Sequence, residues 1–545
     1  MINKFNLILK IVKKINYQVK THILIDKYDS QYISHNLKKW GKYSVGKNKE
    51  KGVILVDLFA KNSLIHFWSY LVNILAKKTN SKIEYFYISL YKSKLLDYKV
   101  SIRRLVKLFQ SFNVTKGISQ HDFKYSKGEI RLFEKKFYAL KFDKKKLIKF
   151  KIENIKIGDL ISDTYMRAHL SSTVNMEDES LKKIFFKAIK FYYVSKSYFN
   201  KNKVVAVIPS HTCYLYGIIS RIAASKNIPI IKVNSDNRGN ENFRINIVDR
   251  KFVNEEAAPY FNFKKEFRKL TTKKQREGLK IGKKIIDNRL SGNYDETLPY
   301  MKISQFNKNF KSSNLILKNK KKKIFIFPHC FFDNVHRFRK MLFTDFHDQI
   351  NFLLNLSKKY DKYEWYYKPH VHELKSEFNK HIEILKNFPN VILLKPKLGH
   401  CEIIKSKPHC IITNHGSVGH EYARFKIPVI FTGDNKHINY KFAYHANSKS
   451  DIENVIKNNK ILRKKIRFNL NELYEFIFMN YFYFQNLYDR KLLIKDTFFN
   501  SKNRSIWDTP AILRHIIKLS DDNDKFIEKY INNLINSKDL KRYFS

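Results

Sequence analysis

"TNHGSVGHEYARFKIPVIF" (residues 413–431) joins a glycine-bearing turn to a helix-like run, EYARFK, and then to an apolar strand, IPVIF. It directly follows another short apolar strand, HCIIT. Strand, turn, helix and strand in this order are the β-α-β unit of parallel α/β sheets, in which ligands bind at the turn after a strand. The stretch therefore predicts an α/β protein with a ligand site at this turn.

The same alternation occurs near the N-terminus. GVILVDLFA (52–60) predicts a buried strand, and a helix-like run and the strand KIEYFYISLY follow it. A second unit begins at KVVAVIPSH (203–211) and continues through a helix-like run to IPIIKVN. Two such units predict a parallel sheet with helices on both faces.

A polar stretch (302–323) interrupts this pattern and is typical of a linker, after which the alternation resumes with KIFIFPHCFF. Beyond about residue 450 the pattern is mostly helical, and we expect the acidic run SDDNDKF (520–526) to be a solvated face. We therefore predict two α/β domains of similar kind, followed by a helical tail. The expected parts are a basic extension (1–50), an N-terminal domain (51–300), a linker (301–322), a C-terminal domain (323–450) and a helical region (451–545).

Composition limits the class of protein. The 545 residues are 43% hydrophobic and 15% aromatic, which is ample for folded cores. The net charge of +57, from 106 Lys and Arg against 49 Asp and Glu, has two interpretations. One is attraction to nucleic acid, anionic lipid or an anionic substrate. The other is a compositional bias of the whole chain, which the even spread of basic residues favours.

Cysteine usage and the N-terminus bear on location. Cysteines stand at 213, 330, 401 and 410 without a CxxC pair, which argues against structural zinc and a disulfide scaffold and favours a reducing cytoplasm. No apolar run reaches the ~18 residues of a membrane span. The start, MINKFNLILKIVKKINYQVK, alternates apolar and basic residues. It is either an interfacial helix at the inner membrane face or, as we favour, an ordinary surface helix.

Polar residues follow three predicted strands of the C-terminal domain. They are Pro328-His329, then His370 and His372, then His415-Gly416-Ser417. Ligands of open α/β sheets bind at this edge, so the recurrence favours one shared site, although a lone histidine is usually structural.

The turn itself has a chemical use. Gly416 and Gly419 would let the backbone approach a ligand, and Ser417 adds a hydroxyl at the start of a helix. Backbone N–H groups and the helix dipole there favour phosphate. The alternative is a turn that only connects strand to helix.

YYKPHVHE followed by TNHGSVGHEYARFKIPVIF resembles the C-terminal domain of bacterial capsule and surface-polysaccharide synthesis proteins. Those are GT-B glycosyltransferases, and the CDP-glycerol glycerophosphotransferases are related to them. The resemblance covers roughly residues 323–435. IGDLISDTYMR (157–167) and SHTCYLYGIISRIAASKNIPI (210–230) are similar to N-terminal segments of the same group.

The resemblance implies a GT-B-like fold of two Rossmann-type domains with a cleft between them. The N-terminal domain would bind the acceptor and the C-terminal domain the nucleotide sugar. His370 falls on the family's His-Pro motif and Ser417 on its Ser/Thr motif, so both would hold donor phosphates. Glu421 stands where a ribose-binding acid is common, and Val371 replaces the usual proline. The expected donor-binding set is His329, Lys368, His415, Gly416, Ser417, Gly419 and Glu421.

Sugar transfer builds negative charge on the departing phosphate, which His370, the turn amides and Lys368 or Arg424 would stabilise. The acceptor hydroxyl needs a general base from the N-terminal domain. The first candidates are Asp163 and His211, and Asp57 is the third. The expected catalytic residues are therefore His370, Asp163 and His211. No Asp-X-Asp motif lies near the cleft, which favours a reaction without a metal or other cofactor.

The leading interpretation is a cytoplasmic glycosyltransferase that moves a sugar or polyol phosphate from a nucleotide-linked donor, such as a CMP- or CDP-linked one. The acceptor would be a surface polysaccharide or a lipid-linked glycan. A nucleotide-sugar epimerase of GT-B-like fold is the first alternative. Others are a basic nucleic-acid-binding protein, for which no RRM, KH, helix-turn-helix or zinc-finger signature is present, and a non-catalytic polysaccharide-binding or export partner.

Overall fold

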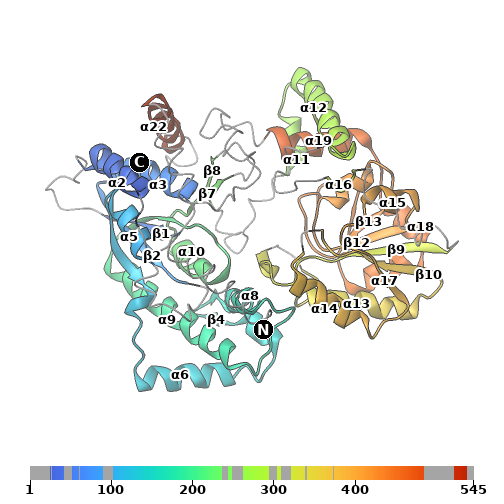
Figure 1. The fold of residues 1–545 in the computed structure, drawn as a ribbon, viewed down its shortest axis with the longest axis horizontal. Helices are drawn as coiled ribbons and strands as arrows, with labels where there is room; N and C mark the ends of the chain where they lie inside the picture. The colour runs from blue at the N-terminus through green and yellow to red at the C-terminus, as the bar shows by residue number, and fades with distance from the viewer. Residues whose placement is uncertain are drawn as a thin grey trace, which may run out of the picture.

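The computed structural model places two α/β units side by side (Figure 1). The structure describes residues 25, 27–41, 52–59, 62–89, 102–235, 243–247, 262–293, 304–307, 321–337, 341–371, 373–483 and 521–536. The expected N-terminal amphipathic segment, most of the expected linker, and His372 lie outside these residues.

The N-terminal unit is built on a four-stranded parallel sheet in the order β3-β2-β1-β6. Its strands are β1 (Gly52–Asp57), β2 (Ser81–Tyr87), β3 (Val114–Ser119) and β6 (Val204–Ile208). Every residue of β1 is buried, as its unbroken apolar run predicted. The unit also contains two hairpins, β4 (Lys151–Ile152) with β5 (Ile155–Lys156) and β7 (Ile231–Ser235) with β8 (Phe243–Ile247).

Helices cover both faces of this sheet (Figure 1). They are α2 (Lys27–Trp40), α3 (Asn62–Thr79), α5 (Arg103–Gln110), α6 (Lys127–Tyr138), α7 (Lys144–Lys149), α8 (Gly158–His169), α9 (Glu179–Lys201) and α10 (Gly217–Ser225). Helix α2 falls within the expected basic extension, yet it is part of the unit. The fully buried guanidinium of Arg104 pairs with Asp29 of α2 at 2.5 Å.

The C-terminal unit has a six-stranded, fully parallel sheet in the order β11-β10-β9-β12-β13-β14. Its strands are β9 (Lys322–Phe327), β10 (Tyr363–Tyr367), β11 (Val391–Leu393), β12 (Cys410–Thr413), β13 (Val429–Phe431) and β14 (Tyr444–His445). Its helices are α13 (Phe346–Lys359), α14 (Lys375–Leu385), α15 (His400–Lys405), α16 (Val418–Ala423), α17 (Lys449–Lys457), α18 (Asn459–Lys465) and α19 (Leu470–Phe478).

Counted along the chain, the strands of this unit lie in the Rossmann order 3-2-1-4-5-6, and the N-terminal sheet follows the same scheme as 3-2-1-4. The predicted class, α/β with two Rossmann-type units, is confirmed. In such sheets the direction of winding reverses between the first and fourth strands, and ligands bind outside the carboxyl ends of these two. These switch points lie between β1 and β6 in the N-terminal unit and between β9 and β12 in the C-terminal unit.

Two segments cross from one unit to the other. Helices α11 (Phe263–Arg268) and α12 (Thr272–Leu290) pack on α19 of the C-terminal unit, although we expected residues up to 300 to belong to the N-terminal domain. A Cβ at Gly282 of α12 would lie 2.1 Å from the carbonyl oxygen of Tyr474, so the helices meet where no side chain fits.

The last described helix, α22 (Asp521–Ile535), returns to the N-terminal unit and packs on α3 (Figure 1). Its apolar residues Ile527, Ile531 and Ile535 are buried there, at the i, i+4, i+8 spacing of one helix face. The acidic run 520–526, which we expected to be a solvated face, leads into this helix, and its Lys525 is exposed. The apolar face that covers the first unit begins just after the run, at Ile527.

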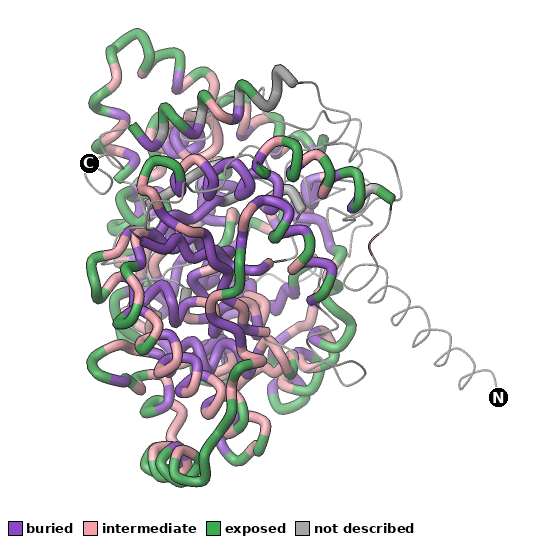
Figure 2. Tube along the Cα trace, turned by 90° about the vertical axis from the view of Figure 1, so that its left-hand side faces the viewer, coloured by how far each residue is buried: buried purple, intermediate pink, exposed green. Residues whose placement is uncertain are grey.

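Side chains of both units meet in a shared hydrophobic core, and Figure 2 shows buried segments running through the middle of the molecule. Polar bonds also join the units: Lys144 contacts Asp345 and Asp348, and Lys380 donates to the carbonyl of Leu170. In the part of the chain that the structure describes, no helix combines the length and the hydropathy needed to cross a membrane.

Candidate functional site at two switch points

The C-terminal switch point gathers residues that the sequence predicted to share a site. His329 follows β9, and His415 follows β12, the neighbouring strand. Their rings lie 5.8 Å apart and nearly perpendicular, and Phe346 at the start of α13 contacts both, at 4.9 and 6.3 Å. The predicted meeting of these two strand ends is therefore present.

The turn after β12 leaves room on one side. Gly416 has φ of +135°, a conformation that residues with a side chain rarely adopt, and the nearest atom to a Cβ built there is 3.8 Å away. Ser417 is half-buried, and its side chain makes no capping hydrogen bond to α16. Since α16 is a single short helix of six residues, the turn amides and the Ser417 hydroxyl, rather than a helix dipole, are what this turn offers an anion.

Gly419 has a different reason to be glycine from the one expected. A Cβ there would lie 2.5 Å from the ring of Phe431 and 3.1 Å from His437. The close approach is therefore between α16 and the sheet inside the unit, and not between the backbone and a ligand.

Glu421 is buried and faces Arg289 of the crossing helix α12, whose Nη1 lies 3.6 Å from its carboxylate. The same guanidinium nitrogen lies 2.8 Å from Nε2 of His420 and donates to the hydroxyl of Tyr481 at 3.1 Å. A ribose hydroxyl would have to compete with Arg289 for Glu421, so the ribose-binding role stays a prediction.

The end of β10 is fixed by buried bonds. Lys368 is 4% exposed and donates from Nζ to the carbonyl oxygens of Pro396, at 2.7 Å, and Pro369, at 3.2 Å. Burial lowers the pKa of Lys368 to about 8. The lysine thereby holds the loop after β10 to the loop after β11, and its proton is less firmly bound than that of a surface lysine.

His370 is exposed at this loop, and β9 lies between its strand and the turn after β12. His370 therefore follows a strand that is not adjacent to β12. Its backbone N–H donates to Glu373 at 3.4 Å, and Glu373 is in turn 2.9 Å from Nε2 of His381. Tyr367 bonds the other ring nitrogen of His381 at 2.7 Å. The buried Glu373–His381 pair holds the His370 loop and was missed from the sequence.

The N-terminal switch point carries a chain of three polar side chains. Ser210, just after β6, donates its hydroxyl and, at 3.2 Å, its backbone N–H to Oδ2 of Asp57 at the end of β1. Nδ1 of His211 lies 2.9 Å from the Ser210 hydroxyl. Asp57 is 1% exposed, and its other oxygen has no hydrogen-bond partner among the described residues. Burial raises the pKa of Asp57 to about 7, although the Ser210 bonds act to lower it.

Asp163 serves the contact between the units. Its carboxylate accepts hydrogen bonds from the backbone N–H of His336, at 3.1 Å, and from Nδ1, at 2.6 Å. The other ring nitrogen of His336 lies 2.9 Å from the carbonyl of Thr344. Burial lowers the pKa of His336, but the carboxylates of Asp163 and Asp159 and the carbonyl of Thr344 together more than offset this and leave the pKa raised. Both ring nitrogens face acceptors, which fits an imidazolium. A base role would require Asp163 to release His336.

The loops that follow β6 and β9 approach one another. Burial raises the pKa of Tyr214, in the loop after β6, and the carboxylate of Asp333, in the loop after β9, adds to the shift. The guanidinium of Arg167 on α8 lies 5.7 Å from the ring of Phe332 in the same β9 loop. The two switch points therefore belong to facing surfaces of the two units.

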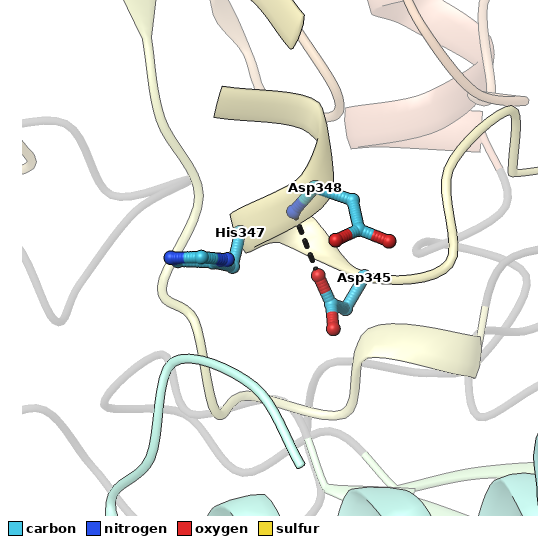
Figure 3. Close-up of side chains that lie close together, drawn as sticks. All are labelled: Asp345, His347 and Asp348. Carbon is cyan, nitrogen blue, oxygen red and sulfur yellow. Dashed lines mark hydrogen bonds between the residues drawn. The ribbon is translucent and has the colours of Figure 1, made fainter. Parts of the chain in front are cut away.

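Two groups of described residues place metal-ligating atoms within 4.8 Å of one another: Asp345, His347 and Asp348, and Glu373, Glu377 and His381. Figure 3 shows the first group at the start of α13, where the Asp348 amide donates to Asp345. Lys144 bonds both carboxylates of that group, and His381 bonds Glu373 in the second. Each group thus has protein partners that fix its side chains, and metal-independent chemistry stays a prediction.

No family model matches the sequence, and no curated protein matches it. Among solved structures, a UDP-GlcNAc 2-epimerase from Neisseria meningitidis aligns over 77% of this chain and 95% of its own, with 12% identity and a TM-score of 0.26. The Thermosulfurimonas dismutans β-Kdo 2,4-transferase KpsC aligns over 50% and 79%, with 10% identity and a TM-score of 0.30. The calicheamicin glycosyltransferase CalG4 aligns over 78% and 95%, with 9% identity and a TM-score of 0.20. Likenesses at this level carry no information about activity.

Proposed function

We propose that this chain is a glycosyltransferase that binds a nucleotide-linked donor at the C-terminal switch point and activates an acceptor hydroxyl at the N-terminal one. The observation that carries the proposal is the placement of two chemically different polar groups at the switch points of two facing Rossmann-type sheets. One is a glycine–serine turn with open space beside it. The other is a buried carboxylate linked through a serine to a histidine.

On the donor side, the departing phosphate gains negative charge as the sugar leaves. The backbone amides of the Gly416–Ser417 turn and the Ser417 hydroxyl would donate hydrogen bonds to it. His370 would approach from the loop after β10, which Glu373 and Lys368 hold in place. Fixed donors of this kind stabilise the charge without reorganising during the reaction.

On the acceptor side, Nε2 of His211 would take the proton of the attacking hydroxyl. Nδ1 faces the Ser210 hydroxyl, which donates to Asp57, so the chain orients the imidazole and stabilises its positive charge. A pKa near 7 leaves Asp57 able to hold or release a proton at the working pH. Asp163 is a weaker candidate because His336 occupies its carboxylate.

The finer assignment rests on the sequence resemblance. The donor would be a nucleotide sugar, with CMP- and CDP-linked compounds tested first, and the acceptor a surface polysaccharide or lipid-linked glycan. The net charge of +57 suits work at an anionic membrane surface at the cytoplasmic face.

The test is thermal-shift binding of CMP, CDP, UDP and GDP compounds to the purified chain and to Ser417→Ala. We expect one nucleotide to raise the melting temperature and the variant to lose most of the shift. Ser450→Ala, an exposed serine on α17, is the matched control and should retain it. Failure of every nucleotide to bind would overturn the donor site. Interconversion of a free nucleotide sugar without any acceptor would replace the transferase with an epimerase.

A further inference from the structure

A cavity of about 540 Å³ lies between the two units, outside the residues assigned above to donor and base. One wall is the segment 173–177, between α8 and α9, together with Phe142 and Lys144 near the start of α7. The facing wall is the first turns of α13, with His347, Asp348 and Asn351. Its volume lies in the ~300–1,000 Å³ range of small-molecule sites.

The base of this cavity is held by a network across the units. Nζ of Lys144 lies 3.0 Å from Asp345 and 2.7 Å from Asp348, and Thr173 donates to Asp345 at 2.5 Å. Burial lowers the pKa of Lys144, but these carboxylates more than offset it, so its pKa is raised. Figure 3 shows the two carboxylates beside each other at the start of α13. The cavity walls are therefore fixed before any ligand arrives.

The charge of the cavity is opposite to that of the chain. Its single lysine is already shared by two aspartates, and Glu177 adds an exposed carboxylate to the rim. In a protein of net charge +57 this is a local acidic surface. A phosphate or an acidic sugar would meet carboxylates and an occupied ammonium, so an anion is disfavoured.

One wall of the cavity carries an aromatic side chain, that of Phe142. Phe142 is 54% exposed, although removing a large apolar side chain from water is favourable in free energy. Its backbone and that of Lys141 are left-handed, with φ of +53° and +51°, which is uncommon for residues with bulky side chains. Such conformations persist where the surrounding structure requires them and cluster at binding sites. The turn thus places a partly exposed aromatic ring, which lies 6.4 Å from the ring of Tyr138, in the wall of the cavity.

We propose that this cavity binds a neutral sugar unit of the acceptor, with Phe142 packing on the C–H face of the ring and Asp348 and Asn351 accepting or donating hydrogen bonds at its hydroxyls. Carboxylates and planar amides match the donor and acceptor pattern of neighbouring hydroxyl groups. That this sugar belongs to the acceptor rests on the proposed glycosyl transfer. Sugar binding in the cavity does not depend on it.

Its position suits that role. Phe346 packs on His329 and His415 of the C-terminal switch point, and the next two residues, His347 and Asp348, line the cavity. A glycan seated in the cavity would therefore extend past the start of α13 toward the donor site.

The test is binding of the full chain to an immobilised panel of neutral, amino-containing and acidic oligosaccharides, with calorimetry on the strongest neutral binder. We expect neutral glycans to bind, and Phe142→Ala and Asn351→Ala each to weaken binding about tenfold, the loss expected for one aromatic or polar contact. Leu132→Ala, another exposed apolar residue of the same unit, is the matched control and should bind normally.

Preference for acidic glycans, no bound neutral glycan, or full affinity in both cavity variants would overturn the proposal. Nucleotide thermal shifts on the same samples separate the two ideas. Nucleotide binding without glycan binding would leave the proposed function standing and remove the acceptor cavity. Glycan binding without any nucleotide binding would do the reverse.

Discussion

The two switch points occupy equivalent places in two sheets of the same winding, yet their chemistry differs. At the N-terminal one, burial places the pKa of Asp57 near 7 and a serine joins it to a histidine. At the C-terminal one, Gly416 has a positive φ and opens a turn. Burial lowers the pKa values of the nearby His420 and His437 well below the ordinary value of histidine.

The difference shows how one fold supplies two kinds of site. The topology fixes where a ligand can lie, because it brings the carboxyl ends of the first and fourth strands together. Burial and sequence then decide whether that place holds a proton or receives an anion. If the roles are divided in this way, substitutions at the two switch points should affect different steps.

The largest effect is expected from Asp57→Asn. Loss of the buried carboxylate should lower kcat by about 10²- to 10⁴-fold, the usual contribution of acid–base catalysis, and leave donor binding intact. Steady-state kinetics with a saturating donor measures it. His211→Ala should give a similar loss, and the double variant little more, because the residues act as one unit. Normal turnover in both single variants would end the base assignment; Asp361→Asn, on the surface, is the control.

Arg289→Ala should destabilise the C-terminal unit by about 3–5 kcal/mol, because it removes a buried cation that lies beside the buried carboxylate of Glu421. Chemical denaturation measures the change. Lys283→Ala removes an exposed ion pair with Asp287 of the same helix and should cost far less. If Glu421→Ala instead weakened nucleotide binding and left stability unchanged, Glu421 would be the ribose ligand that the sequence predicted.

The units should respond to pH in opposite directions. Asp57 has a raised pKa in the folded state, so its carboxyl group loses its proton at a lower pH in the unfolded chain than in the folded one. The free energy of unfolding therefore falls, by at most about 4 kcal/mol, as pH rises from about 4 to about 7. His420 and His437 have lowered folded pKa values, so their contribution is present above about pH 6.5 and is lost as pH falls.

Urea unfolding of the chain and of Asp57→Asn from pH 4.5 to 7.5 tests the first part. The variant should gain stability relative to the parent as pH rises through this range. Parallel curves would mean that Asp57 titrates as it does in the unfolded chain.

The two glycines of the turn should separate stability from binding. Gly419→Ala forces the new methyl group against Phe431 and should cost about 1–3 kcal/mol, with little effect on nucleotide affinity once folded. Gly416→Ala has space for its methyl group and should mainly distort the turn, so it should weaken nucleotide binding. Equal thermal shifts from nucleotide in Gly416→Ala and the parent would argue against the turn as donor site.

The sequence predicted most of the architecture because buried parallel strands are short apolar runs that need no partner to be recognised. Residues 52–60, 203–211 and 409–413 are examples, and each is a strand in the structure over most of its length. The crossings were missed because helices α12 and α22 carry ordinary amphipathic patterns. Such a pattern shows that a face is buried and says nothing about which unit covers it.

The candidate site was predicted in part. The polar residues after β9 and β12 do meet, since strand ends in one sheet share an edge. The Asp57–Ser210–His211 chain was only partly foreseen, because pairing of β1 with β6 spans some 150 residues and leaves no local signal. The role of Gly419 depends on its contact with Phe431 in the next strand, and that of Asp163 on His336, which lies 173 residues away along the chain.

The return of α22 to the first unit has a consequence for synthesis. The face of α3 that Ile527, Ile531 and Ile535 cover is complete only when α22 has left the ribosome. At ~5–20 residues per second, the roughly 300 residues between the end of β7 and the end of α22 take about 15–60 s to make. During that interval the nascent N-terminal unit exposes an apolar surface, so we expect its production in cells to depend on chaperones that shield this surface until α22 packs on it.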